Sequence, residues 1–272
     1  MGLPDGRQSE ISSTLGLNSP TVVALDEAGQ FDCQANGTRP PPPSTADSAK
    51  WTLAFYLGAT RTVPSTLTIS QPQRRNRMTF DPVHFSGKSF DGPVYYGARV
   101  RYQFGGIPWF GVETEFIHSK VYADTRQSVH VAGQRDGQPI SRRVLLQEIV
   151  QQYSISHGVK LLLFNAAFQY PLRSRQAPLN LFSFTGRVGI GPTVPHTESS
   201  IEGRRQEQYE WGRVAWQASG GIEIQIHRGL IALMEYKFTR TNQRGSVSLG
   251  VARSLLRTHH GVFGLGYRFS GP

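Results

Sequence analysis

The strongest constraint on the fold of this chain is a two-residue alternation of apolar and polar side chains that recurs from Trp51 onward. In 94–104, valine, tyrosine, alanine and phenylalanine alternate with glycine, arginine and glutamine, and 214–226 and 232–239 repeat the pattern. Successive side chains of a β-strand point to opposite faces, so a period of two predicts strands. The sequence therefore predicts an all-β fold.

The alternating segments have the length of strands that cross a membrane. Eight ranges are expected to form strands: 51–61, 92–104, 108–123, 153–170, 180–196, 211–227, 229–242 and 257–269. Soluble strands usually have about five or six residues, whereas a tilted strand needs about 9 to 11 to cross a bilayer. We therefore predict an antiparallel up-and-down transmembrane β-barrel of about eight strands, with apolar side chains facing lipid and polar side chains facing the lumen.

The connections alternate in length, which gives the barrel a direction. The connection at 227–229 is very short, whereas 124–152 and 242–257 are long. Short periplasmic turns and long external loops are typical of outer-membrane barrels. We expect 62–91 to be the first external loop, with 76–85 as a local hairpin arm above the membrane.

The first 50 residues have no such alternation. They contain the proline run 39–44, and we expect 1–50 to be a disordered Pro-rich arm and 51–272 to be the outer-membrane barrel. Residues 1–30 lack a basic start followed by an apolar core, so no signal peptide is seen although the expected location is the bacterial outer membrane. The single cysteine, Cys33, allows no disulfide within the chain.

Composition excludes some classes of protein. No segment reaches the roughly 18 to 20 apolar residues of a membrane helix, and mean hydropathy is -0.35. The net charge of +10 favours an anionic partner. Nucleic acid fits that charge but not the alternating faces, so the expected partners are the outer membrane and lipopolysaccharide or lipid A. The oligomeric state is left open, with a monomer favoured.

Charged residues on the polar face are expected to pair inside the lumen, because buried charges need partners and a small barrel is filled by side chains. The expected lumen ion pairs involve Arg99, Glu113, Glu115, Glu235 and Lys237. Folding the first short turn about Gly106 predicts that Arg99 lies opposite Glu113, with both side chains inward.

Several histidines are expected at one height, near the outer rim. The candidate catalytic residues are His118, His157, His196 and Glu198, because imidazole and carboxylate groups can act as acids, bases or metal ligands. Strand parity places His118, Lys120, His196, Glu198 and His259 toward lipid and His157 and His260 inward. Rim histidines also occur as interfacial residues without chemistry, and this alternative stays open.

Basic residues near the same rim are candidates for binding lipid phosphate: Lys120, Arg142, Arg143, Arg204 and Arg205. Arginine binds phosphate through two parallel hydrogen bonds. General adhesion to lipopolysaccharide explains these residues without catalysis. The common nucleotide-binding, zinc-protease and serine-hydrolase motifs are missing from the sequence.

Several short strings carry a family resemblance. They are SFDGPVYYG at 89–97, WFGVE at 109–113, FIHSKVY at 116–122, SHG at 156–158, VPHTE at 194–198 and EYKF at 235–238. Together they resemble the small outer-membrane barrels known as lipid A oxidase-like proteins of α-proteobacteria, over about residues 51–269. The resemblance implies oxygen-dependent oxidation of the proximal glucosamine of lipid A to an aminogluconate unit. There, an acid–base group would act on the sugar C1 hydroxyl and a divalent metal would activate molecular oxygen. It assigns no catalytic residues, cofactor or metal ligands.

Three other functions remain as alternatives. A non-catalytic barrel could tether or seal the outer leaflet, since a fold does not imply a function. A lipid A deacylase on a similar barrel is expected to place His and Ser two residues apart, on one face of a strand. Here His118 directly precedes Ser119 and Ser156 directly precedes His157, so the two side chains of each pair point to opposite faces. A soluble lipocalin-like barrel is favoured only by the missing signal peptide.

Overall fold

The structure is a computed structural model that describes residues 49–172 and 181–270, apart from the side chains of residues 156, 157 and 270. The chain divides into two units, Met1–Pro42 and Pro43–Pro272, and every described residue belongs to the second. The predicted arm, 1–50, lies outside the described residues except for its last two, and Lys50 already belongs to the first strand.

The described residues form thirteen β-strands and two short 3-10 turns. The strands are β1 (Lys50–Gln71), β2 (Asn76–Ser86), β3 (Tyr96–Gln103), β4 (Phe110–Ala123), β5 (Ser128–Arg135), β6 (Gln138–Leu145), β7 (Val150–Pro171), β8 (Phe182–Gly191), β9 (Thr193–Ile201), β10 (Arg204–Tyr209), β11 (Ala215–His227), β12 (Leu230–Val247) and β13 (Gly250–Ser270). The turns are η2 (Pro72–Arg74) and η3 (Leu146–Glu148). Among the described residues, no helix has the length and apolarity of a membrane-spanning helix.

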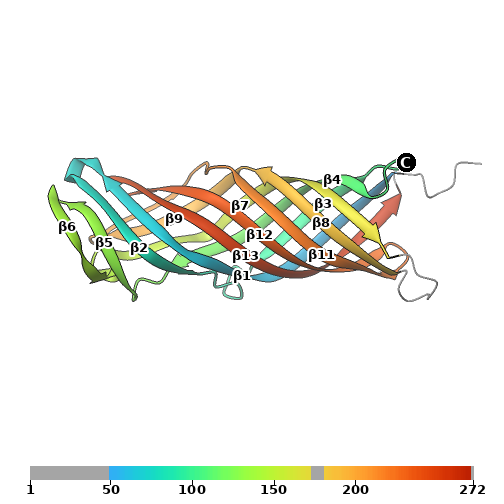
Figure 1. Cartoon of the computed structure of the whole chain (residues 1–272), viewed down its shortest axis with the longest axis horizontal. Coiled ribbons are helices and arrows are strands. Elements are labelled where there is room, and N and C mark those ends of the chain that lie inside the picture. Colours follow the sequence, from blue (N-terminus) through green and yellow to red (C-terminus); the bar gives the residue numbers. More distant parts are fainter. Residues whose placement is uncertain (1–48, 173–180, 271–272) are drawn as a thin grey trace, which may run out of the picture. The chain divides into compact units, whose positions relative to one another are not determined.

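All thirteen strands belong to one antiparallel sheet, and the pairings of eight of them return to their starting point (Figure 1). The cycle, called the ring below, runs β1–β3–β4–β7–β8–β11–β12–β13 and back to β1. The eight ranges expected from the sequence account for these ring strands. The total of thirteen is more than the predicted number of about eight, and the additional strands are β2, β5, β6, β9 and β10.

The additional strands correct the prediction of long external loops. The ranges 62–91, 124–152 and 242–257 are mostly strand. Strands β1 and β7 run on past the ring and pair with β2 and β9, β12 and β13 continue as one long hairpin, and β5 pairs with β6. Figure 1 shows β5 and β6 at the end of the sheet opposite to the end of β13. We call this part the extension: the strands β2, β5, β6, β9 and β10 with the distal parts of β1, β7, β12 and β13.

The range 76–85 does form a hairpin with the end of β1, as predicted. The range 180–196 is divided at Pro192, which has no amide hydrogen to donate to a sheet. Strands β8 and β9 follow one another along the same partner, β7. This division places His196 on β9.

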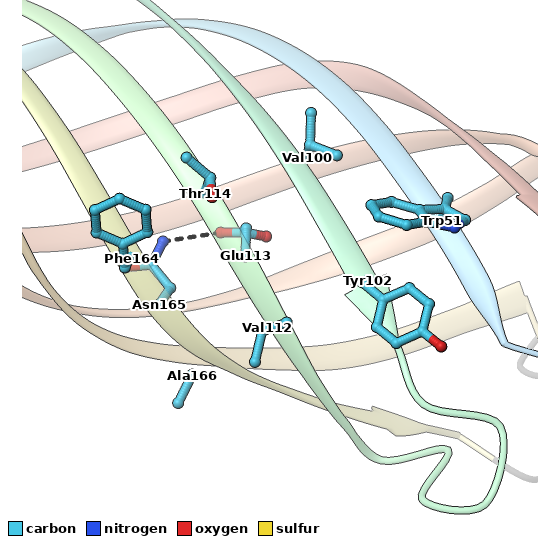
Figure 2. A pocket seen from close by; sticks show the side chains of 9 residues that line it. All are labelled: Trp51, Val100, Tyr102, Val112, Glu113, Thr114, Phe164, Asn165 and Ala166. Atoms are coloured by element: carbon cyan, nitrogen blue, oxygen red, sulfur yellow. Dashed lines mark hydrogen bonds between the residues drawn. The ribbon is translucent and has the colours of Figure 1, made fainter.

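In the ring, apolar side chains point outward and charged side chains point inward. Glu113 and Asn165 are each 4% exposed and are joined by a hydrogen bond of 3.0 Å between β4 and β7 (Figure 2). Their chain neighbours Val112 and Phe164 are 46% and 56% exposed. The same holds around the ring for the outward residues Leu53, Phe55, Leu57, Val100, Val188, Met234, Phe263 and Leu265, all of which are exposed.

The inward charges form one network, as the sequence predicts. Arg187 contacts Glu113 at 3.0 Å, Glu235 at 2.6 Å and Glu223 at 3.3 Å. The other ion pairs are Arg99 with Glu113, Glu115 and Glu235, Arg101 and Arg268 with Glu223, and Lys237 with Glu115 and Glu235. Both signs are therefore present inside the ring, and each carboxylate there contacts at least one cation.

The predicted register of the first hairpin is wrong by two residues. Arg99 pairs with Glu115 and Arg101 with Glu113, which centres the turn on Ile107 instead of Gly106. The amides of Ile107 and Phe110 donate to the carbonyls of Phe104 and Ile107, so the turn is longer than expected. A shift of two residues keeps every side chain on its face, and Arg99 still lies 3.7 Å from Glu113.

The extension is built in the opposite sense. Its interior is apolar and buried, with Leu67, Ile69, Met78, Phe80, Val83, Val129, Val131, Leu146, Val150, Ile155 and Ile201 each at most 1% exposed. Four arginines on the edge strands of the extension, Arg142, Arg143, Arg204 and Arg205, are exposed. This is the arrangement of a soluble sheet packed around a core.

Candidate functional site on the outer face

A group of polar side chains lies on the outward face where the ring meets the extension. On β4 the even-numbered residues point outward, and this alternation leads from the exposed Val112 to His118 and Lys120. These two side chains are only 3% and 2% exposed, although they share the face of the apolar residues. We define the outer-face cluster as His118, Lys120 and Tyr122 of β4, Lys160 of β7, His196 and Glu198 of β9, and Glu207 and Tyr209 of β10.

Backbone pairing brings these residues together across four strands. His118 pairs with Lys160. In a second row across the sheet, Tyr122 pairs with Ser154, Ser154 with Glu198, and Glu198 with Glu207. His196 pairs with Tyr209 in the next outward row of the β9–β10 hairpin. Side chains at directly opposed positions lie about 4.5 to 5.5 Å apart at Cβ, so the cluster is a consequence of the register.

A bulge in β7 makes room for the His118 ring. Ser119 pairs with Val159 and Val121 pairs with Ile155, so β7 contains two more residues than β4 over this interval. Gly158 lies in the bulge with φ +97, and a Cβ added there would lie 2.5 and 2.6 Å from His118 Cδ2 and Nε2. Glycine is therefore required both by the backbone conformation and by the close approach of the imidazole.

On its other side the His118 ring stacks on Tyr96 of β3, with centroids 4.9 Å apart and an interplanar angle of 13°. Tyr96 is 42% exposed and belongs to the apolar outward face of the ring. His118 is thus held between an aromatic side chain and the backbone of β7. The cluster borders directly on the apolar face.

His196 lies between two carboxylates. Its Nε2 is 3.2 Å from Glu207 Oε1, and its Nδ1 is 3.7 Å from Glu198 Oε1. The side chain of His196 is 4% exposed, that of Glu198 is 11% and that of Glu207 is 42%. Gln152 Nε2 donates to Glu198 Oε2 at 3.2 Å, and the Tyr209 ring lies 4.0 Å from the imidazole. One imidazole and two carboxylates therefore converge at the outer surface.

Lysines surround this acidic part. Lys88 and Lys120 place their ammonium groups 4.7 and 5.7 Å from the centroid of the Tyr122 ring, and Lys160 lies 5.1 Å from that of Tyr209. These are distances at which a cation is attracted to a ring face. Lys120 also donates to the carbonyl of Asp91 at 2.8 Å. The cluster thus combines positive groups, two carboxylates and two imidazoles on one face.

The structure brings together four of the residues expected from the sequence: His118, Lys120, His196 and Glu198. Their outward orientation agrees with the parity prediction, as does that of His259, whose Nδ1 lies 2.5 Å from the hydroxyl of the exposed Tyr236. His260 points inward, is 1% exposed and contacts Thr239 and Tyr95. The side chain of His157 lies outside the described residues, although its backbone belongs to the bulge of β7.

The predicted phosphate-binding arginines are not part of the cluster. Arg142 and Arg143 lie on β6 and Arg204 and Arg205 on β10, the two edge strands of the sheet. All four are exposed. Charged side chains on edge strands hinder pairing with other sheets, so a structural role accounts for them as well as phosphate binding does.

The sequence prediction misses three members of the cluster, Lys160, Glu207 and Tyr209, and also Gly158, which lies against His118. Glu207 and Tyr209 fall in the range 197–210, which was expected to be a loop. The available signal is Glu202-Gly203, which forms a two-residue hairpin turn with φ 48 and 76. Positive φ at both central residues and a glycine at the second are typical of such turns. A hairpin there would have placed Glu207 opposite Glu198.

Comparison with known proteins gives weak likenesses only. No family model and no curated protein matches the chain. Among solved structures, Ail, the attachment invasion locus protein of Yersinia pestis, is 10% identical with a TM-score of 0.34, over 82% of this chain and 98% of that one. Neisserial surface protein A is 9% identical with a TM-score of 0.33, over 81% and 99%. At these values the likeness assigns neither a family nor a function.

Proposed function

We propose that this chain is a bacterial outer-membrane β-barrel that associates with lipopolysaccharide, with the ring as its membrane-spanning part. The observation that carries this proposal is the inverted distribution of polarity in the ring. Arg187 and Lys237 are each at most 2% exposed inside it, whereas Phe55 and Phe263 are 61% and 60% exposed outside. A soluble protein rarely exposes so continuous an apolar surface, and a membrane barrel requires one.

The outer-face cluster is the proposed site for the lipid A head group. It adjoins the apolar face through Tyr96, so an amphiphile could place acyl chains against the ring and its head group against the cluster. Lys88, Lys120 and Lys160 offer positive charge to phosphate groups. The extension, with its exposed arginines, would then project beyond the membrane surface.

The more specific form of this proposal is chemical modification of lipid A. His118 and His196 are imidazoles on the lipid-facing side, and Glu198 is close enough to His196 to orient it. The resemblance seen in the sequence implies oxidation of the proximal glucosamine at C1. In the balanced reaction the C1 hemiacetal, water and molecular oxygen give the aldonic acid and hydrogen peroxide, so lipid A gains one oxygen atom while molecular oxygen takes up two electrons.

Mass spectrometry of lipid A tests this form directly. The chain is expressed behind a working signal peptide with oxygen present, and lipid A is compared with that of cells lacking it. A gain of one oxygen atom, lost in His118→Ala and in His196→Ala but kept in His130→Ala on β5, is the expected result. Unchanged lipid A, with the chain shown to be folded in the membrane, would exclude oxidation of the lipid A tested.

A second candidate function is non-catalytic adhesion or sealing of the outer leaflet. The observation that favours it is the extension itself, with exposed arginines on both edge strands and a buried apolar interior. Binding of lipopolysaccharide without any change in its mass is the expected result. Detergent-free solubility of residues 51–272 as a folded monomer would contradict both candidates, because both require the ring to be embedded in a membrane.

A further inference from the structure

We propose that His196, Glu198 and Glu207 bind a divalent transition-metal ion. One ligand atom from each residue can be chosen so that all three lie within 4.8 Å of one another. Ligand atoms held by one ion at about 2.0 to 2.2 Å are at most roughly 4.4 Å apart. Glu198 faces Nδ1 of His196 and Glu207 contacts Nε2, so one carboxylate must move for both to share an ion with the same ring nitrogen. The side chain of Glu207, which is 42% exposed, has the freedom to do so.

The charge pattern of the β9–β10 hairpin supports an ion at this place. Glu198 and Glu207 are directly opposed in the register and point to the same face. Like charges at directly opposed positions destabilise a sheet. Arg205 is 3.3 Å from Glu207 but its side chain is 68% exposed, so its attraction is weakened by solvent. His196 already lies between the two carboxylates, and a dication held by all three side chains would attract both of them.

The surroundings of His196 hold its ring ready to coordinate. The imidazole is 4% exposed, and Tyr209, its cross-strand partner, lies 4.0 Å away. Gln152 donates to the Oε2 atom of Glu198, which leaves the Oε1 atom directed at His196. Hydrogen bonds of this kind orient the ligands of metal sites.

The ligand set selects a class of ion. One imidazole nitrogen and two carboxylate oxygens suit first-row divalent ions such as Zn²⁺ or Mn²⁺, whereas Ca²⁺ prefers six to eight oxygen ligands. Three protein ligands leave at least one coordination position open. Because Glu207 is exposed, that position faces outward, where a phosphate or sugar oxygen of a bound head group could complete the shell. The inference goes beyond the proposed function and does not require lipid.

Zinc titration of the full chain, refolded in detergent and treated with a chelator, tests the site. Calorimetry is expected to show one Zn²⁺ bound per chain, and Co²⁺ is expected to give a visible absorption band at the same stoichiometry. Glu207→Gln and Glu198→Gln should each weaken Zn²⁺ binding by more than about tenfold, since even loss of an outer-shell partner costs about 10- to 100-fold.

Two variants serve as matched controls. Glu202→Gln removes a carboxylate at the turn of the same hairpin, where it pairs with Arg74 and Arg135. His130→Ala removes an exposed histidine on β5. Both should keep wild-type Zn²⁺ affinity. The proposal is overturned if the wild-type chain binds no Zn²⁺, if Glu207→Gln and Glu198→Gln bind it as tightly as wild type, or if His130→Ala abolishes binding. Because the titration contains no lipid, a negative result would contradict the metal site without testing the proposed action on lipid A.

Discussion

The ring and the extension share strands but bury opposite kinds of side chain. Within β1, Phe55 and Leu57 are exposed on the outward face of the ring, while Leu67 and Ile69 are fully buried inside the extension. The change occurs at a bulge between Thr62 and Leu67. A continuous sheet therefore adapts to two environments, and the boundary is set by which face carries the apolar residues.

The outer-face cluster lies at that boundary. There the outward face is no longer apolar, and the interior changes from charged residues to residues such as Ile117 and Ile155, which are at most 1% exposed. If the ring spans a membrane as proposed, polar side chains at this boundary would meet lipid head groups and not acyl chains. The following predictions test the contrast between the two regions, from the largest expected effect to the smallest.

The first prediction concerns the interior of the ring. Arg187→Met should lower the free energy of unfolding by about 3 to 5 kcal/mol. The substitution removes one cationic partner from each of the buried carboxylates Glu113, Glu223 and Glu235. Urea unfolding in lipid vesicles measures the change. The double variant Arg187→Met with Glu113→Gln should recover part of the loss. If the single variant were as stable as wild type, the inward network would not be important for stability.

The second prediction compares the two outward faces. Val188 on the ring is 53% exposed and Leu145 on the extension is 43% exposed. Val188→Arg should destabilise the chain by about 2 to 4 kcal/mol in a bilayer, because the charge would face acyl chains. Leu145→Arg should change the free energy of unfolding by less than about 0.5 kcal/mol, because its side chain faces water.

Unfolding of both arginine variants in vesicles, with the wild-type chain as reference, measures this difference. Equal and small effects would mean that the ring does not face lipid. Equal and large effects would mean that the extension is also embedded. Either result would end the contrast between the two regions.

The third prediction concerns the boundary. Gly158→Ala should cost about 1 to 3 kcal/mol, because alanine at φ +97 is strained and its methyl group would displace the His118 ring. Gly261→Ala in β13 is the control, because a Cβ there meets nothing within 4 Å. Thermal unfolding measures stability, and lipid A binding reports on the cluster. A Gly158→Ala chain as stable as the Gly261→Ala chain would show that the bulge does not hold His118.

The sequence predicted the ring better than the extension, for a physical reason. The ring strands alternate strongly, because one face carries exposed apolar residues and the other carries buried charges that must pair. Strand β10 reads Arg-Arg-Gln-Glu-Gln-Tyr, which has the composition of a loop, and it forms a strand because β9 supplies its pairing partner. Such tertiary support is not visible in a local pattern.

The register and the site show the same limit. A shift of two residues in the first hairpin preserves every face, so alternation cannot distinguish Glu113 from Glu115 as the partner of Arg99. Parity sufficed to put His118 and His196 outward. It could not bring Glu207 to His196, because that contact depends on the unrecognised hairpin.

The smallest predicted effect is that of the exposed charges on β10. Arg205 contacts Glu207 at 3.3 Å, and their side chains are 68% and 42% exposed. Arg205→Ala should change the free energy of unfolding by only about 0 to 1 kcal/mol, because exposed ion pairs contribute little.

The effect of Arg205→Ala on binding of lipopolysaccharide should be larger at low salt than at high salt, because salt screens the exposed charge. Unfolding and vesicle binding at two salt concentrations measure both effects. A loss of stability above about 2 kcal/mol would show that β10 depends on this pair, and a binding loss independent of salt would mean that Arg205 contacts the lipid within a desolvated site.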